Sequence, residues 1–257
     1  MRKHLRLEEV ARFVIGIVMG AGFAVSAGGQ TILLDLGNNS SFRGVDVTNP
    51  DVNGNHWNSV WAGAFYPDLV DIDGNATEID FGFSSDGGND SFNGPAGVTS
   101  NPPTAAEIAA TDIDAAALGN LGVKEAAFDF YVSSRFQIQQ LDPSKTYDLT
   151  FFGSHKFNDN NMTRYTIYTD DTFSTPVASA DLLVGVDNAH NRDNVVTISG
   201  LAPQTGNILY VGFAGAGGGN GYLNALQITA IPEPSALWLL ASGGGLAFGF
   251  RRRAVSS

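Results

Sequence analysis

Three aromatic residues with polar neighbours form the part of this sequence best suited to holding a sugar. Trp57, Trp61 and Tyr66 lie close together, and Asn58 directly follows the first of them. Aromatic rings offer flat apolar faces, and amide groups can hydrogen-bond to hydroxyls, so this combination suits a neutral carbohydrate. The alternative is structural: a tryptophan can close the end of a β-sandwich, because its side chain buries a large area.

A second group of polar residues surrounds His155 and Arg164, in a stretch that also contains three asparagines. Asparagine favours turns, so we expect a hairpin loop here. Polar loops often carry binding residues, and we therefore include His155 and Arg164 among the glycan-binding candidates. An ordinary solvated loop is the alternative.

The segment DIDGN supplies Asp71, Asp73 and Asn75 on alternate positions, and DVNGN at 51–55 echoes it. Carboxylates and amides spaced in this way can wrap a hard cation such as Ca²⁺. The EF-hand pattern is not met, because the sixth position is Ala76 and no glutamate stands at the twelfth. Alternating apolar residues on both sides of Asp-Gly favour the alternative, a β-hairpin turn.

Motifs for catalysis are missing, so we expect a protein without catalytic residues that is not an enzyme. The sequence contains neither G-x-S-x-G nor H-E-x-x-H. Asp187 and His190 form a D-x-x-H pattern, but the serine block that would accompany it in an esterase is absent. Carboxylates are numerous enough that a glycan-active hydrolase stays open as an alternative.

The balance of charge excludes other classes of partner. The net charge is −12, which makes nucleic acid an unfavourable partner because a phosphate backbone requires a basic surface. The chain has no cysteine, so an exported domain of this sequence must rely on its core or on bound ions.

Many short strands are predicted to position these residues. Apolar or alternating runs bounded by Gly, Asn, Asp or Pro are typical of an antiparallel sandwich. The alanine-rich segment 102–122 departs from this pattern. Thr104 and Glu107 form a capping box at the start of a helix, and Gly119 is suited to ending one. We therefore expect one or two short helices here. The predicted strands cover residues 31–36, 125–132, 147–153, 163–169, 194–200, 207–215 and 222–229.

Residues 1–27 have the layout of a secretory signal peptide. A basic start precedes an apolar run, and Val25-Ser26-Ala27 offers the small residues that signal peptidase accepts. Export through the Sec translocon and cleavage after Ala27 is the expectation. An N-terminal membrane anchor is the alternative.

The C-terminus, residues 231–257, has a different three-part layout. Pro232, Glu233 and Pro234 precede a short, mostly apolar segment, and Arg251, Arg252 and Arg253 follow it. We expect the apolar segment to form a transmembrane helix whose arginines stay in the cytoplasm. Its 16 residues from 235 to 250 would span only about 24 Å, so the anchor would be transient.

This tail resembles the PEP-CTERM sorting signal. The resemblance implies handling by an exosortase, a membrane-embedded protease or transpeptidase of Gram-negative bacteria that make exopolysaccharide. It also implies a final location in the cell envelope, on the cell surface or in the extracellular matrix. A plain tail anchor is the alternative.

A second resemblance lies inside the domain. The order GNHWN (54–58), LVDIDGNATEIDF (69–81), the stretch 141–169 and GYLNALQIT (221–229) is similar to secreted malectin-like and galactose-binding-like jelly-roll domains. Such domains bind glycans in some members and are adhesive or architectural in others.

Together these observations predict an all-β protein: a jelly-roll antiparallel β-sandwich over residues 28–230 with a short helical insertion. We expect it to be a non-catalytic surface or matrix protein that binds polysaccharide, such as exopolysaccharide. A secreted hydrolase and a purely structural adhesin are the alternatives.

Overall fold

The computed structural model describes residues 29–61, 63–83, 89–92, 100–156 and 161–232. The expected signal peptide and the tail beyond Pro232 lie outside these residues, as does the expected transmembrane segment. Within the part of the chain that is described, no helix has the length and apolar character needed to cross a membrane.

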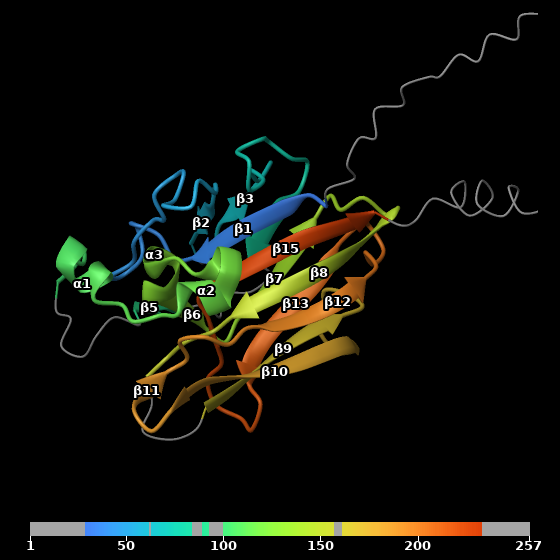
Figure 1. Ribbon diagram of the computed structural model, residues 1–257. Helices are drawn as coiled ribbons and strands as arrows, with labels where there is room; N and C mark the ends of the chain where they lie inside the picture. The colour runs from blue at the N-terminus through green and yellow to red at the C-terminus, as the bar shows by residue number, and fades with distance from the viewer. Residues whose placement is uncertain (1–28, 62, 84–88, 93–99, 157–160, 233–257) are drawn as a thin grey trace, which may run out of the picture.

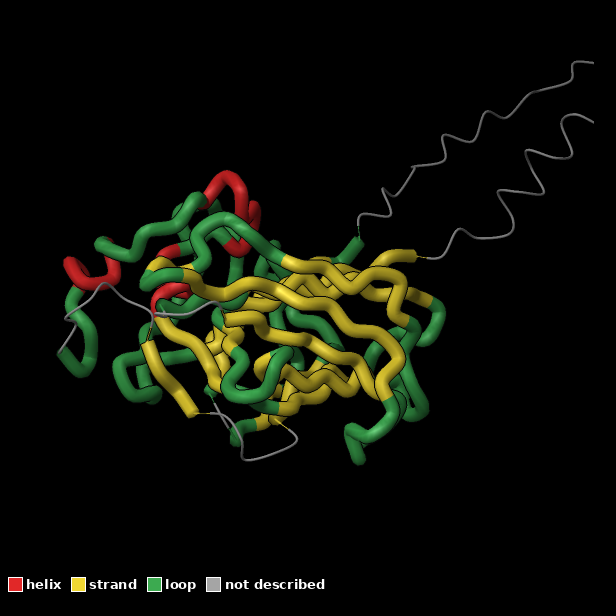
Figure 2. The backbone as a smooth tube through the Cα atoms, turned by 90° about the horizontal axis from the view of Figure 1, so that it is seen from below, coloured by secondary structure: helices red, strands yellow, loops and turns green. Residues whose placement is uncertain are grey.

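The described chain is built mainly of β-strands in two stacked sheets, as expected (Figures 1 and 2). One sheet has five strands in the order β12-β8-β15-β1-β2, antiparallel except for the parallel pair β1–β2. Its strands are β1 (Thr31–Leu36), β2 (Asn58–Val60), β8 (Lys145–Phe152), β12 (Val196–Leu201) and β15 (Ala225–Pro232).

The second sheet has seven strands in the order β11-β10-β9-β13-β7-β4-β3, all antiparallel. Three of its six pairings, β9–β13, β13–β7 and β7–β4, join segments far apart in the sequence. Its strands are β3 (Phe65–Tyr66), β4 (Asp80–Phe83), β7 (Arg135–Gln139), β9 (Asn161–Tyr168), β10 (Pro176–Val186), β11 (Ala189–His190) and β13 (Leu209–Gly215).

A small third sheet and the helices complete the fold. The sheet consists of β5 (Asn89–Phe92), β6 (Asp129–Val132) and β14 (Tyr222–Leu223). The helices are α1 (Ala105–Ala109), α2 (Ala115–Leu118), the 3₁₀ turn η1 (Gly119–Leu121) and α3 (Lys124–Phe128).

The core lies between the two large sheets, because alternate residues on their strands point inward. In β8, Tyr147, Leu149 and Phe151 are buried on one face, as their spacing predicts. Phe151 stacks on Tyr165 of β9 with ring centroids 4.4 Å apart and planes 13° apart. The Tyr165 hydroxyl is satisfied inside the core by donating to the carbonyl of Tyr222 at 2.6 Å.

The helical insertion is confirmed, and so are its sequence signals. The Glu107 N–H donates to the Thr104 hydroxyl at 3.3 Å, and the Thr104 N–H donates to the Glu107 carboxylate at 2.7 Å, which completes the capping box. Gly119 follows α2 with a φ of 60°, where glycine avoids the strain of other residues.

The expected strand at 125–132 is only half right. Residues Lys124–Phe128 form α3, and the strand β6 begins at Asp129. Ala126, Ala127 and Phe128 are buried, so tertiary packing stabilises a helix in a run whose period was ambiguous.

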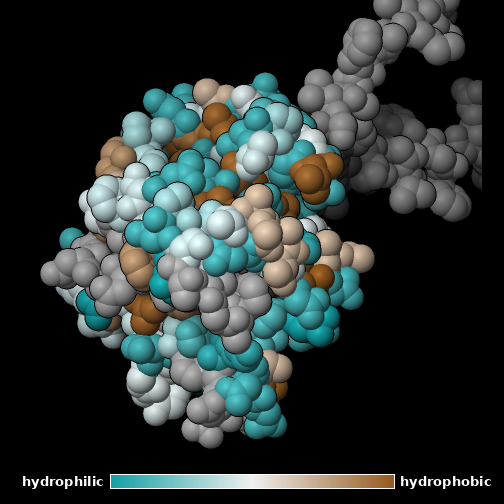
Figure 3. Space-filling model, turned by 90° about the vertical axis from the view of Figure 1, so that its left-hand side faces the viewer, coloured by the Kyte–Doolittle hydropathy of each residue, from teal (hydrophilic) through white to brown (hydrophobic). Residues whose placement is uncertain are grey.

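The chain enters and leaves the fold at the same end. β1 and β15 are antiparallel neighbours, with Thr31 opposite Thr229, so Gln30 and Pro232 lie at one end of the sheet. The helices and β11 gather at the opposite end, which we call the distal end (Figure 1). Figure 3 looks onto the distal end and shows a largely hydrophilic surface interrupted by separate hydrophobic patches.

Candidate functional site

Trp57 is not available to a ligand. Its side chain is 2% exposed and packs in a second buried cluster with Leu33, Leu121 and Phe152. The indole Nε1–H donates to the Asp51 carboxylate at 2.8 Å. The structural alternative therefore holds for this tryptophan, and its place among the glycan-binding candidates was wrong.

Asn58 also has a structural role, whereas Trp61 and Tyr66 lie together near the surface. The Asn58 amide donates to the carbonyls of Leu33 and Val70, and its oxygen accepts from the Val70 N–H. Trp61 is 44% exposed, and its backbone N–H donates to the Tyr66 hydroxyl at 2.6 Å. Tyr66 packs against the main core.

The structure places His155 and Arg164, expected in one polar patch, in different surroundings. The His155 ring stacks on Tyr222 at 4.2 Å and meets the edge of Phe130 at 4.8 Å. Burial lowers its pKa from 6.5 to about 4, so the ring is neutral at neutral pH. Arg164 instead lies within β9 on the exposed side of the seven-stranded sheet.

The DIDGN segment is a tight turn. One Asp71 carboxylate oxygen accepts the backbone N–H groups of Asp73 and Asn75, at 3.1 and 2.8 Å. Val70 and Ala76 form a β-bridge across the turn, which bears out the hairpin alternative. In the described ranges, no three His, Asp or Glu side chains are grouped so that they could hold a metal ion.

The side of the seven-stranded sheet that faces away from the core, here called the outer face, carries an aromatic row. Strand register aligns its members: Phe65 opposes Gly82, Gly82 opposes Gln137, Gln137 opposes Tyr210, and Tyr210 opposes Tyr168. Neighbouring strands lie about 4.8 Å apart, so the row from Phe65 to Tyr168 crosses roughly 19 Å of sheet.

Two glycines let rings of this outer face lie on the sheet itself. A Cβ at Gly82 would come within 2.9 Å of the Phe65 ring, and one at Gly212 would come within 3.1 Å of the Tyr168 ring. The missing side chains at Gly82 and Gly212 therefore leave the space that these two rings occupy on the outer face. Phe65 is 53% exposed.

Next to this row lies a shallow depression of about 230 Å³. Gly212 forms part of its floor, between Arg135 of β7 and Thr166 of β9 in the strand register. We call it the arginine depression, and the lining residues used below are Ser134, Arg135, Arg164, Thr166, Tyr168 and Gly212.

The two arginines of the depression are held differently. Arg164 makes two 2.7 Å hydrogen bonds to Asp181 of the adjacent strand β10, and these bonds lower the pKa of the Asp181 carboxyl. Arg135 lies over the Phe173 ring, 4.9 Å from its centroid. Phe173 itself stands edge-on to Tyr168 and Tyr210, at 5.4 and 6.0 Å.

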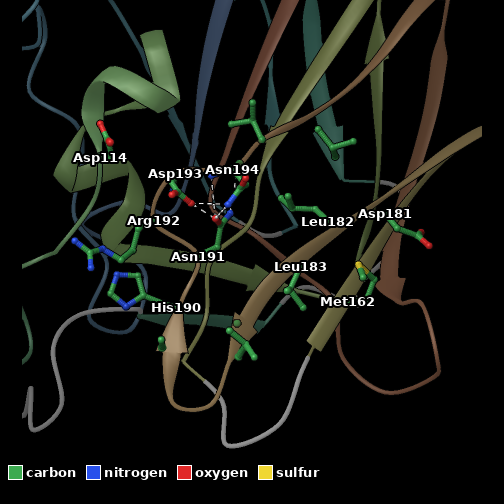
Figure 4. Close-up of a pocket in the computed structure, with 15 residues that line it drawn as sticks. Asp114, Met162, Asp181, Leu182, Leu183, His190, Asn191, Arg192, Asp193 and Asn194 are labelled. Carbon is green, nitrogen blue, oxygen red and sulfur yellow. Dashed lines mark hydrogen bonds between the residues drawn. The ribbon is translucent and has the colours of Figure 1, made fainter.

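A larger hollow of about 700 Å³ adjoins the outer face at β10 (Figure 4). Met162 and Leu183 lie side by side in it, next to Asp181, while His190 and Arg192 lie on the other side, below the helix that carries Asp114. Asp181 lines the hollow and pairs with Arg164 of the arginine depression, so the two are neighbours on the surface.

His190 and Arg192 hold the helical insertion against the sheets. The Arg192 guanidinium donates to the Asp112 carboxylate at 2.8 Å, and His190 Nε2 lies 2.7 Å from the Asp112 carbonyl. Asp187 and Asn188 have φ of 48° and 62° and form the turn between β10 and β11. The D-x-x-H pattern therefore marks a hairpin.

Comparison with known protein families identifies the C-terminal segment. Residues 230–253 match the PEP-CTERM protein-sorting motif. Among curated proteins, none matches this chain. The motif directs exosortase-dependent sorting to the cell surface, which confirms that part of the prediction made from Pro232, Glu233 and Pro234.

The PEP-CTERM motif begins on the last strand. Ala230 and Pro232 belong to β15, and Pro232 pairs with Lys145 of β8. Glu233 and the arginines at 251–253 lie outside the described residues. Since the motif starts at the end where the chain leaves the fold, the distal end is the part of the domain farthest from it.

The outer face was missed by the sequence analysis, apart from Arg164. The signal that could have found it is the alternation in RFQIQ (135–139), which puts Arg135, Gln137 and Gln139 on one side of a strand. The remaining residues of the outer face come from the strands that lie beside β7, and no local sequence pattern predicts which strands these are.

Proposed function

We propose that this chain is an exported, non-catalytic surface protein that binds polysaccharide along the outer face of its seven-stranded sheet. The sorting motif accounts for its delivery to the cell surface. The resemblance to malectin-like and galactose-binding-like jelly-roll domains, noted from the sequence, agrees with a glycan ligand.

The observation that carries the proposal is the pair of rings laid over glycines. Phe65 packs against Gly82 and Tyr168 against Gly212 on the same outer face, with the planar amide of Gln137 between them in the row. Apolar ring faces and planar amides are the groups that C–H faces and hydroxyls of a sugar require. A row this long suits a chain of sugars more than a single one.

The test is retention of the full chain, purified in mild detergent, on exopolysaccharide from the producing cell. Phe65→Ala should weaken binding roughly twofold to tenfold, which is the range expected for one aromatic contact. Phe42→Ala is the matched control, because Phe42 is 56% exposed and Phe65 53% exposed, and Phe42 lies in a loop away from the outer face. It should leave retention unchanged.

Other outcomes would contradict the proposal in different ways. Equal retention by both variants would mean that the site lies elsewhere. No retention of the unmodified protein would favour a structural adhesin. Turnover of the glycan, lost on replacing a single carboxylate, would favour the hydrolase alternative.

A further inference from the structure

Arg135 is the cation of the outer face that lacks a carboxylate partner among the described residues. Arg164, on the far side of the arginine depression, is neutralised by two hydrogen bonds to Asp181. Arg135 makes none of the ion pairs found in the described ranges, and its side chain is exposed. Asp170 and Asp171 stand in the turn that carries Phe173, so the positive charge here is confined to the Arg135 guanidinium itself.

The guanidinium of Arg135 is held in place. It lies over the Phe173 ring, and the Gly212 backbone beneath leaves room for the stem of its side chain. Phe173 has a φ of 52°, a left-handed conformation that is strained for a residue with a side chain. Backbone strain of this kind often marks a functional position. Here the strained residue is Phe173, whose ring packs against the Arg135 guanidinium.

The depression also offers a hydroxyl beside the guanidinium. Thr166 lines it and lies opposite Gly212 in the strand register. Ser134 lines it too, but its hydroxyl is buried from solvent and out of reach of a ligand. The Asp181 carboxylate is already occupied by Arg164. A guanidinium fork with an adjacent hydroxyl donor matches the acceptor oxygens of a carboxylate.

We propose that the arginine depression binds the carboxylate of an acidic sugar, so that the polysaccharide held by the outer face contains uronic acid residues. This inference rests on the proposed function and specifies its ligand. The aromatic row would contact the sugar rings, and Arg135 would contact a carboxylate on one of them.

The test compares polygalacturonate oligosaccharides with their methyl esters, using the full chain in mild detergent. Esterification removes the charge and leaves the sugar rings intact. The unmodified protein should bind the acid form about 10- to 100-fold more tightly, as expected for a charge-assisted bidentate contact. Arg135→Gln should remove this preference, and Arg135→Lys should restore only part of it, because lysine lacks the planar fork.

Lys156→Gln is the matched control. It changes the net charge by the same amount, and Lys156 is exposed outside the depression. It should change affinity by less than about twofold, which separates a direct contact from a long-range field. If Arg135→Gln lowers the melting temperature, the comparison of acid and ester on the unmodified protein still decides.

Equal binding of acid and ester would overturn the inference and leave the proposed function standing. Competition by polyglutamate as strong as that by polygalacturonate would also overturn it, since any carboxylate polymer would then suffice. Failure of the protein to bind either sugar or its own exopolysaccharide would overturn the proposed function itself.

Discussion

Replacing Trp57 should destabilise the domain, whereas replacing Trp61 should not. Trp57 is 2% exposed and fills the cluster that joins β1, η1 and α3, so Trp57→Ala leaves a cavity. Truncating a buried aromatic residue costs about 3–5 kcal/mol in the free energy of unfolding. The Asp51 carboxylate would also lose its indole donor, at roughly 1–3 kcal/mol more.

Thermal melting followed by circular dichroism measures the difference. For a domain of this size, each kcal/mol shifts the melting temperature by about 2–4 °C, so Trp57→Ala should melt at least about 6 °C lower. Trp57→Phe keeps most of the ring and loses the hydrogen bond, so its shift should be smaller. Trp61→Ala is the matched control; its side chain is 44% exposed, and truncation should cost less than about 1 kcal/mol.

The glycan assay then separates the two roles. Trp57→Ala variants that remain folded at low temperature should still bind, because the indole faces no ligand. Loss of glycan binding by Trp57→Ala at an unchanged melting temperature would refute the reasoning, since the indole would then belong to a binding surface.

Three further predictions follow from the tail, the DIDGN turn and the buried histidine. Replacing Glu233 or deleting residues 251–253 should leave a longer species in the inner membrane; unchanged size and location on fractionation and immunoblotting would count against sorting by this signal. EDTA should not alter the melting temperature, because the Asp71 carboxylate already caps its own turn; a fall of several degrees would reinstate calcium. Burial lowers the pKa of His155 to about 4, so the stability it contributes is present above pH 6.5 and is lost as the pH falls towards 4. Discounted for partial exposure, that loss should reach about 1–2 kcal/mol in urea titrations and vanish in His155→Phe; parallel pH profiles of the two proteins would contradict it.

Local signals predicted part of this fold: the expected strands overlap β1, β8, β9, β12, β13 and β15, whereas β4, β7 and β10 were not expected. The capping box at Thr104 and the glycine at 119 mark the helical insertion, because both act within a few residues. The Asp-Gly turn after Val70 is equally local. The segment 125–132 was misread because its apolar residues fit a strand and a buried helix equally well.

The binding candidates could not be ranked in the same way, because burial is decided by tertiary packing. Trp57 and Trp61 have similar neighbours in the sequence, yet one is buried beneath the helical insertion and the other is half exposed. Judged by the residues around them in the sequence, both tryptophans are candidates to stack on a sugar ring. Only the position of η1 and α3, more than sixty residues away in the chain, separates them.

The outer face also depends on tertiary structure that local sequence patterns do not predict. Phe65, Arg135, Tyr168 and Tyr210 come from four strands, and they share one face because β13 lies between β7 and β9 while β3 lies beside β4. The pairings of β13 with β7 and β9, and of β4 with β7, join segments far apart in the sequence. Glycines at 82 and 212 then decide that rings lie on the sheet instead of standing away from it. A glycine within a strand usually weakens it, and an aromatic ring packed over it from a neighbouring strand recovers part of that loss, so the two pairs stabilise the sheet as well as forming the surface that we propose for the glycan.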